Sequence, residues 1–252
     1  MSGDGYHKHE RGHKKWSVAT HLNPDENFIE EWQKDFSSAI LGEDVQAKTY
    51  DHRNGRFQYL NRAKSRDVVV SQGLHALYQN EKSQVDLKIF LELREDLRLQ
   101  FKEQRDSTVR NHSKSDNLDE IKRRKIDYIK YIEIQKKSAD LYVFQTSTKQ
   151  NSTKVDQVVV EIQSPALLDF LYLSFLPFVR HCEVVNVGNN KRALLFNFVD
   201  QIEAIALMGA LTRGSKVLLD YFPEANYPRV GSMGLISALT LLSVTYKRSK
   251  SN

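Results

Sequence analysis

The chain has 252 residues, of which 40% are hydrophobic and 27% are charged, as is ordinary for a globular protein with one substantial core and a smaller appended unit. The formal charge of +5 favours an anionic partner but does not choose between a nucleotide, a sugar phosphate and a nucleic acid. A single cysteine, Cys182, excludes an internal disulfide and favours the cytoplasm, and the longest apolar stretches, 166–179 and 234–246, are too short to predict a membrane span.

The polar N-terminus places three histidines within a few residues of one another. A metal site is one interpretation, but the spacing of His7, His9 and His13 matches no standard ligand set, and the lysines beside them disfavour a cation. Asn23 or Asp25 is expected to cap the helix that follows. The apolar face of that helix carries Phe28, Ile29, Trp32, Phe36 and Ile40.

Two short segments then lead to the middle of the chain. The pair Asn54-Gly55 indicates a turn, so Tyr50 and His52 just before it are either ligand contacts or ordinary turn residues. Residues 67–78 are expected to form a buried parallel strand, with Val68–Val70 at its centre, that runs into a glycine turn.

A basic helical hairpin is predicted between two strands in the segment 86–143. The apolar run Leu87–Leu91 has the length of a strand, and a helix, a charged loop at 111–117 and a second long helix follow it. The second helix carries a one-sided stripe made of Ile121, Ile126, Ile129 and Ile132. A basic lid of this kind suits phosphate, because arginine offers forked donors and a permanent charge. A solvated helix pair without a ligand is the alternative, and nucleic-acid binding is disfavoured because no stacking aromatic residues interleave the charges.

An ordered series of residues runs through this hairpin, namely Gln104-Arg105-Asp106, Arg110, Ser113, Asp127-Tyr128, Tyr131-Ile132, Gln135-Lys136 and Ala139-Asp140-Leu141. The series resembles the lid of the phosphoribulokinase/uridine kinase family. The resemblance implies an α/β fold, with a P-loop kinase-like, mostly parallel sheet, a helical lid at about 97–132 and a C-terminal α+β extension. It also implies an ATP- and Mg²⁺-dependent phosphotransferase that acts on a hydroxyl group of a sugar phosphate, which is favoured, or of a nucleoside.

The same resemblance implies roles for particular residues. The implied catalytic residues are Asp4, as general base on the accepting hydroxyl group, and Arg105 and Arg110, on the transferring phosphate. The implied acceptor contacts are His7, Arg11, Tyr50 and His52. The implied contacts on the nucleotide side are Gln72 and Lys102, and Asp4 and Gln72 are the implied magnesium ligands.

Two departures from the family pattern favour an alternative function. Gln72 stands where the family has a glutamate that helps to hold magnesium, and an amide supplies no negative charge. The phosphate-cradling motif G-x-x-x-x-G-K-[ST] occurs nowhere in the 252 residues. The chain therefore resembles a member without its first strand and P-loop, and we expect it to be unstable or oligomeric alone unless an N-terminal fragment complements it. The alternative is a non-catalytic pseudokinase or regulatory protein that binds a phosphorylated ligand or a partner.

The C-terminal part offers structural elements but no catalytic constellation. The polar stretch 145–153 is predicted to link a kinase-like domain, 1–144, to an α+β region, 154–252. In that region we expect a strand at 155–162, a helix after Ser164-Pro165, a hairpin at 183–198, and helices over 201–211 and 232–247.

Overall fold

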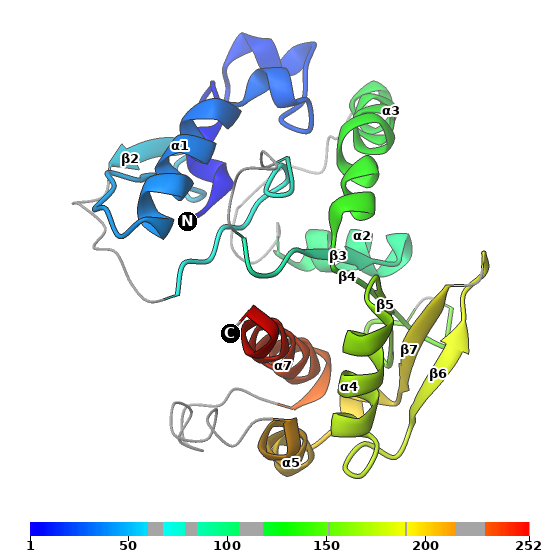
Figure 1. Ribbon diagram of the computed structural model, residues 1–252. Helices are drawn as coiled ribbons and strands as arrows, with labels where there is room; N and C mark the ends of the chain where they lie inside the picture. The colour runs from blue at the N-terminus through cyan, green and yellow to red at the C-terminus, as the bar shows by residue number, and fades with distance from the viewer. Residues whose placement is uncertain are drawn as a thin grey trace. The chain divides into compact units, whose positions relative to one another are not determined.

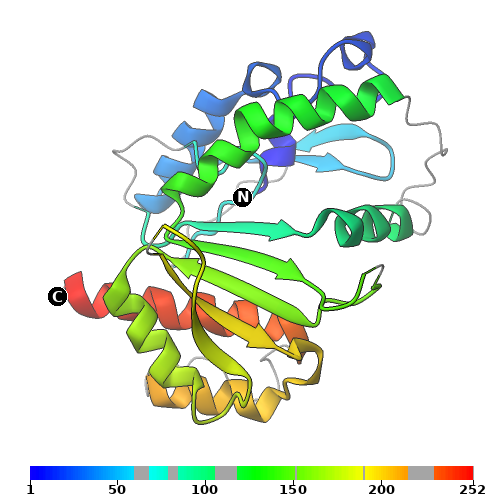
Figure 2. The same cartoon turned by 90° about the vertical axis from the view of Figure 1, so that its right-hand side faces the viewer.

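The structure is a computed structural model that describes residues 1–59, 68–78, 85–105, 118–150, 152–189, 191–214 and 230–251. The chain divides into two compact units. Unit 1 comprises Met1–Gln84 and Arg105–Ser138, and unit 2 comprises Val85–Gln104 and Ala139–Asn252. Figures 1 and 2 show the elements of both units.

Unit 1 is built mainly from short helical turns. Its elements are the 3₁₀ helices η1 (Gly3–Tyr6), η2 (Lys14–Ser17) and η3 (Pro24–Glu26), helix α1 (Ile29–Ile40), the hairpin β1 (Lys48–Asp51) and β2 (Arg56–Tyr59), helix α3 (Leu118–Asp127), the π-helix η5 (Tyr128–Ile132) and the 3₁₀ helix η6 (Glu133–Ser138). The expected helix therefore begins at Ile29, and Asn23 caps η3 instead, by accepting a hydrogen bond from the backbone N–H of Asp25.

Helix α1 supplies the apolar centre of this unit. Its expected face is confirmed for Trp32 and Phe36, which are buried, whereas Phe28 just before the helix is 39% exposed. The ring of Trp32 stacks on that of Tyr6, with 5.9 Å between the centroids. The Tyr6 hydroxyl group in turn donates to Asp35 at 2.8 Å, so α1 holds η1 by both an apolar and a polar contact.

Two predictions for unit 1 are wrong. Val68 and Val70 are 72% and 66% exposed and form no strand; among the described residues of this stretch, the pairing is a parallel bridge between Ser2 and Gln72. The isoleucine stripe also fails, because Ile126 and Ile129 are exposed and only Ile132 is buried, while the side chain of Ile121 lies outside the described part. A π turn follows α3 and shifts the helical register, so a period of 3.6 residues does not continue through it.

Unit 2 is a sheet with helices. Its elements are β3 (Ile89–Leu93), α2 (Glu95–Arg105, up to Gln104 in this unit), β4 (Leu141–Thr146), β5 (Gln157–Ile162), α4 (Pro165–Phe175), β6 (Cys182–Asn186), β7 (Arg192–Asn197), the 3₁₀ helix η7 (Val199–Gln201), α5 (Ala204–Gly214) and α7 (Gly231–Ser251). The strand order is β3-β4-β5-β7-β6. These elements confirm the α/β class and the predicted C-terminal helices and hairpin.

The sheet differs from expectation in the direction of its strands, and it continues across the stretch that was expected to be a linker. Only β3 and β4 pair in parallel, and the remaining three pairs of described strands are antiparallel, so the sheet is mixed rather than mostly parallel. β4 and β5 pair over their whole lengths, with Leu141 opposite Ile162. The stretch 145–153, expected to link two domains, therefore belongs largely to the connection within one hairpin.

The core of unit 2 lies between one face of the sheet and helices α4, α5 and α7 (Figure 2). Alternate strand residues face this core, among them Val158 and Val160 on β5 and Leu194 and Phe196 on β7, all with no exposed surface. Cys182 is also part of it, and burial raises the pKa of its thiol to about 12, so the thiol is neutral at physiological pH.

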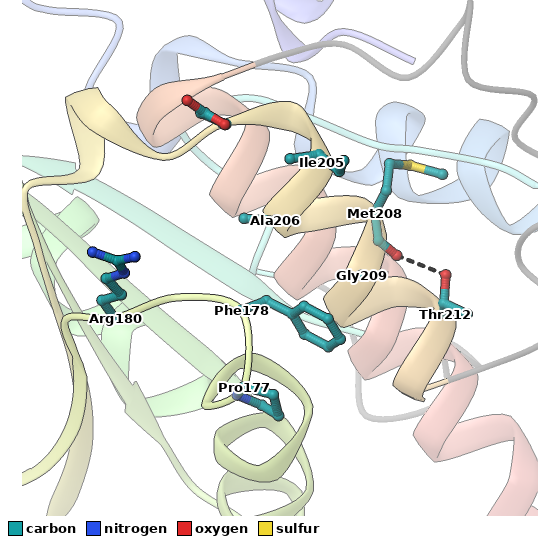
Figure 3. Close-up of a pocket in the computed structure, with 9 residues that line it drawn as sticks. Pro177, Phe178, Arg180, Ile205, Ala206, Met208, Gly209 and Thr212 are labelled. Atoms are coloured by element: carbon teal, nitrogen blue, oxygen red, sulfur yellow. Dashed lines mark hydrogen bonds between the residues drawn. The ribbon is translucent and has the colours of Figure 1, made fainter.

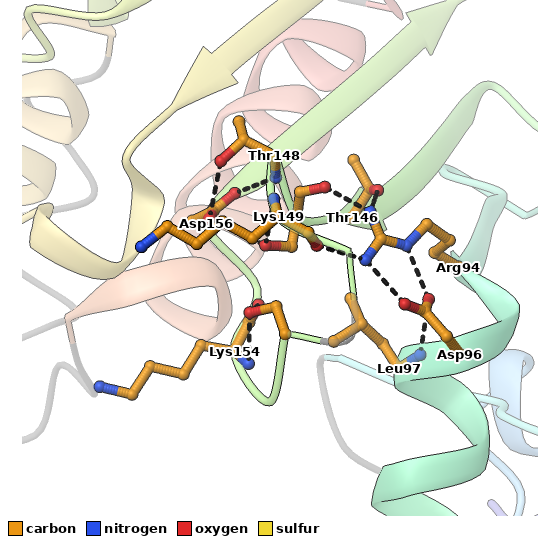
Figure 4. A network of polar contacts seen from close by, with 10 residues as sticks. Arg94, Asp96, Leu97, Thr146, Thr148, Lys149, Lys154 and Asp156 are labelled. Atoms are coloured by element: carbon orange, nitrogen blue, oxygen red, sulfur yellow. Dashed lines mark hydrogen bonds and ion pairs between the residues drawn. The ribbon is translucent and has the colours of Figure 1, made fainter.

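A polar network closes the ends of β3 and β4 (Figure 4). The guanidinium group of Arg94 donates to both carboxylate oxygens of Asp96, at 2.6 and 2.8 Å, and to the carbonyl groups of Ser147 and Lys149. Asp156 accepts hydrogen bonds from the hydroxyl group of Ser147 and the backbone N–H of Thr148. These contacts order the β4–β5 connection.

Among the helices that the structure describes, none is long and apolar enough to cross a membrane.

Candidate functional site

Asp4 is held in place by two glycines that flank it on η1. A Cβ atom on Gly3 would lie 2.5 Å from the ring of Trp32, and one on Gly5 would overlap the backbone carbonyl group of Lys48. The backbone N–H of Gly3 also donates to the carbonyl oxygen of Gln72 at 2.7 Å. Only glycine allows η1 to lie this close to both α1 and β1, and the position of the Asp4 backbone follows from these contacts.

The carboxylate of Asp4 pairs with the imidazole of His52, whose Nε2 lies 2.9 Å from Asp4 Oδ2. His52 comes directly after β1, and its ring lies 5.1 Å from that of Tyr50 on the same strand. Both members of the pair keep more than a third of their side-chain surface exposed. The pair is thus formed within the protein but remains open to a ligand.

His7 continues this arrangement as the residue that ends η1. Its ring contacts those of Tyr50, at 5.9 Å, and His21, at 5.2 Å. Burial lowers the pKa of His7, and the neighbouring Asp4 opposes that shift. The imidazole is therefore neutral at pH 7 and can donate one hydrogen bond and accept another.

Arg11 belongs to the same neighbourhood, where it supports the hairpin. Its Nη2 donates to the carbonyl oxygen of His52 at 2.6 Å, and its backbone N–H donates to Gly55. Gly55 has a φ of +75° and lies directly against the Arg11 side chain, so the turn predicted from Asn54-Gly55 is confirmed and needs its glycine. The guanidinium group is exposed and brings positive charge to the edge of the site.

The remaining predicted site residues lie on other segments than Asp4 and His52, and the structure describes only some of them. Gln72 is exposed, and its backbone pairs with the segment that carries Asp4. Lys102 lies on α2 in unit 2. The side chain of Arg105 and the whole of Arg110 lie outside the described residues, so the predicted action of the lid on phosphate remains a prediction.

Sequence reasoning missed three residues beside His7. The ring of Trp16 lies edge-on to those of His7 and His21, and its indole N–H donates to the carbonyl oxygen of Glu10 at 3.0 Å. His75 Nε2 lies 3.1 Å from the carbonyl oxygen of His21, and burial lowers the pKa of His75 to about 4. The high density of histidine before residue 22 was the signal that could have pointed to His21.

The described residues do not provide a complete magnesium site. They contain no group of three or more His, Cys, Asp or Glu side chains that could hold a metal ion. Of the two implied ligands, Asp4 is engaged with His52, and Gln72 offers a neutral amide oxygen where Mg²⁺ favours carboxylates. The metal does not fit these residues alone.

Unit 2 has a different hollow, of about 670 Å³, beside α5 (Figure 3). Phe178, Ile205 and Met208 give it a mainly apolar lining, and Arg180 and Glu203 are its charged residues. It lacks the close carboxylate–imidazole pair that marks unit 1. Proton transfer therefore has its best-equipped site at Asp4 and His52, where a carboxylate can accept a proton from a bound hydroxyl group.

Comparisons with known proteins agree with an α/β protein of the kinase type. The fold is similar to that of a solved phosphoribulokinase from Rhodobacter spheroides, with a TM-score of 0.64 and 18% identity over 88% of this chain and 85% of that one. The model of the "Phosphoribulokinase / Uridine kinase family" matches residues 2–152, which is more than half of the chain. The chain therefore belongs to the phosphoribulokinase/uridine kinase family.

Individual relatives match a similar length of the chain. A phosphoribulokinase from Synechocystis is 31% identical over 141 residues, which are 56% of this chain and 42% of the relative. The chloroplastic enzymes from Chlamydomonas reinhardtii and Spinacia oleracea are 30% and 27% identical over the same length and are covered to 38% and 35%. The chain thus spans about two fifths of the length of the curated relatives it matches.

Proposed function

We propose that unit 1 is the acceptor-binding part of a phosphoribulokinase-like phosphotransferase, with a sugar phosphate as the favoured acceptor and a nucleoside as the other. The observation that carries this proposal is the Asp4–His52 pair at 2.9 Å, in contact through Tyr50 with the partly buried ring of His7. Family membership supports the reaction class, and the name of the relatives supports a ribulose phosphate as acceptor.

In this function Asp4 takes the proton from the acceptor hydroxyl group as the phosphoryl group arrives. His52 orients the carboxylate through its hydrogen bond, since the Nε2 atom faces one oxygen and leaves the other for the substrate. His7 and Tyr50 supply neutral polar contacts to the sugar, and the exposed guanidinium group of Arg11 contributes positive charge.

The donor side of the proposal rests on the family alone. ATP with Mg²⁺ is the proposed donor, with Gln72 and Lys102 on the nucleotide side and Arg105 and Arg110 on the transferring phosphate. We place the protein in the cytoplasm, with a second copy or a complementing fragment as a candidate partner.

Binding of the acceptor is the first test. In calorimetry with D-ribulose 5-phosphate, we expect His7→Asn and His52→Asn each to weaken binding by tenfold or more, because each removes a neutral or charge-assisted hydrogen bond inside the site. His13→Asn is the matched control, since His13 is exposed and Asn retains the cap that it provides to η2. Equal affinities for all four proteins would exclude this site.

Catalysis needs a separate test with Mg²⁺-ATP as co-substrate. If the protein transfers phosphate, Asp4→Asn should lower kcat by roughly 10²–10⁴-fold while leaving the affinity for ATP nearly unchanged. An undiminished rate would remove Asp4 as the base.

The alternative function is that of a non-catalytic protein that binds a phosphorylated ligand. It is favoured by Gln72, which brings no charge to a magnesium ion. Calorimetry with Mg²⁺-ATP separates the two functions. Sugar-phosphate binding without any binding of nucleotide would support the alternative.

A further inference from the structure

The helical segment 118–138 attaches one of its faces to the rest of unit 1. That face carries Arg124, Asp127, Ile132 and Gln135, which recur at intervals of three to five residues. Asp127 accepts a hydrogen bond from the hydroxyl group of Thr20 at 2.7 Å, and the side-chain amide of Gln135 donates to the carbonyl oxygen of Leu74 at 2.8 Å. The inward side of this segment is therefore held mainly by polar contacts, not by the isoleucine stripe that its sequence suggests.

The other side of the segment is exposed. It carries the residues that we call the outward face, namely Lys122, Lys125, Ile126, Ile129, Lys130 and Ile134. Its isoleucines leave 63%, 52% and 48% of their surface exposed, in chain order. A single exposed isoleucine is ordinary, but isoleucines that recur along one helical face form an apolar strip, and such a strip marks an interaction site.

Positive charge accompanies these isoleucines. Residues 122–137 include seven lysines and arginines and two acidic residues. Of the acidic residues, Asp127 is hydrogen-bonded on the inward side, and Glu133 pairs with Lys136 at 3.4 Å. On the outward face, lysines stand both before and after the first two isoleucines. The occupant of this face must therefore offer an apolar region together with negative charge.

The composition of the outward face favours a lipid surface as that occupant. A second copy of the chain would place lysine against lysine, which is repulsive. Protein interfaces are enriched in aromatic residues, methionine and arginine and are depleted in lysine, whereas this face consists of isoleucine and lysine. An anionic bilayer is flat and deformable, so it can receive a convex helix without a groove. The long lysine side chains let the ammonium groups reach the headgroups while the isoleucines enter the acyl boundary.

We propose that the outward face docks on the surface of an anionic lipid bilayer, with the helical segment lying in the plane of the interface. The isoleucines of the face enter the boundary between headgroups and acyl chains, and its lysines pair with the anionic headgroups. Neither Asp4 nor His52 takes part, so the docking stands independently of the proposed phosphotransferase.

Co-sedimentation with lipid vesicles is the first test. The wild type should bind vesicles of phosphatidylcholine and phosphatidylserine, in a ratio of about 7 to 3, at least roughly tenfold more tightly than vesicles of phosphatidylcholine alone, because each lysine near an anionic surface strengthens binding about fivefold. Equal binding to the two kinds of vesicle, or binding to neither, would overturn the proposal.

The apolar part of the contact is tested with paired substitutions. Ile126→Ser combined with Ile129→Ser should weaken binding to the anionic vesicles about tenfold or more, because two apolar side chains leave the boundary. Val18→Ser combined with Leu41→Ser is the matched control, since these residues are 68% and 76% exposed elsewhere in unit 1, and it should change binding less than about threefold. Ile126→Leu combined with Ile129→Leu keeps the apolar area and should bind as the wild type does. Wild-type affinity in the first pair, or loss of binding in the leucine pair, would sink the idea.

The charged part of the contact has its own control. Lys122→Gln combined with Lys125→Gln should weaken binding to the anionic vesicles about tenfold or more. Lys14→Gln combined with Lys34→Gln removes the same charge from exposed positions elsewhere in unit 1 and should weaken it less than about threefold. Equal losses in the two pairs would show that only the total charge matters, and the outward face would then have no special role.

A polarity-sensitive dye distinguishes insertion from adsorption. Cys182 is buried and its thiol is neutral, so a thiol-reactive dye attaches selectively to the thiol that Ile129→Cys introduces. Addition of the anionic vesicles should shift the emission of this dye to shorter wavelength, because the dye leaves water, and should leave the same dye on Leu41→Cys unchanged. A shift at both positions, or at neither, would contradict docking through the outward face.

Discussion

The two units of this chain are stabilised in different ways. Unit 2 has a continuous sheet with helices α4, α5 and α7 on one face, and many of its core side chains have no exposed surface. Unit 1 holds its site on short turns that are positioned by glycines, ring contacts and side-chain hydrogen bonds. Apolar burial therefore defines the scaffold of unit 2, whereas close backbone approach and polar pairing define the candidate site in unit 1.

The largest expected effect is on the core of unit 2. Leu171 on α4 is fully buried, and Leu171→Ala should lower the free energy of unfolding by about 3 kcal/mol, because it removes apolar contacts and leaves a cavity. Leu173→Ala on the same helix is the control, since Leu173 is 55% exposed and its truncation should cost less than about 1 kcal/mol. Urea unfolding followed by circular dichroism measures both. Equal losses would contradict the assignment of the core.

The next effect tests the close packing of unit 1. Gly5→Ala would place a methyl group on the Lys48 carbonyl group, which cannot move without disturbing β1, so a loss of about 2–3 kcal/mol is expected. Both tryptophans, Trp16 and Trp32, lie in this unit, and their fluorescence during unfolding reports on it. Gly12→Ala is the control, because nothing lies near its Cβ position and only its φ of +83° opposes the change, at about 1 kcal/mol. A Gly5→Ala protein as stable as Gly12→Ala would show that η1 is not packed as described.

A smaller effect concerns the dependence of stability on pH. Burial lowers the pKa of His75 from its ordinary 6.5 to about 4, so the folded state binds this proton less readily than the unfolded state. The stabilisation is complete above pH 6.5 and is lost as the pH falls toward 4, by about 2 kcal/mol between pH 7.5 and pH 5. His7 is shifted in the same direction. Urea unfolding followed by tryptophan fluorescence should show this slope in the wild type, and His75→Asn should reduce it. An unchanged slope would mean that His75 is not the group responsible.

Much of unit 2 could be predicted from the sequence, because apolar patterning and turn chemistry act locally there. Ser164 accepts the backbone N–H of Leu167 and begins α4 as its Ser-Pro pair predicts, and the hairpin of β6 and β7 forms where alternating residues flank Gly188. The direction of pairing was not predictable in the same way, since an apolar run is compatible with either a parallel or an antiparallel neighbour.

The site in unit 1 was only partly predictable. The resemblance to the family named Asp4, His7, Tyr50 and His52, and the structure brings these four together, although their roles remain predictions. Their association with His21 depends on η2 and η3, short turns whose geometry is fixed by tertiary contacts. Hydrophobic periodicity carries no information about such turns, so no pattern placed His21 or Trp16 beside His7.

The smallest expected effect on stability concerns two glycines of α5 in unit 2, Gly209 beside a ring that can move and Gly214 beside a fixed side chain. A Cβ atom on Gly209 would lie 2.5 Å from Cδ1 of Phe178, but that ring is 40% exposed beside the hollow of Figure 3 and can rotate away. Alanine is a better helix former than glycine by roughly 0.5–1 kcal/mol, so Gly209→Ala should leave stability within about 1 kcal/mol of the wild type. Gly214→Ala on the same helix should instead be destabilising by about 1–3 kcal/mol, because its methyl group would meet the fully buried Leu242. Calorimetric melting of both variants checks the contrast, and a larger loss for Gly209→Ala than for Gly214→Ala would mean that the Phe178 ring is held in place and is itself part of the core.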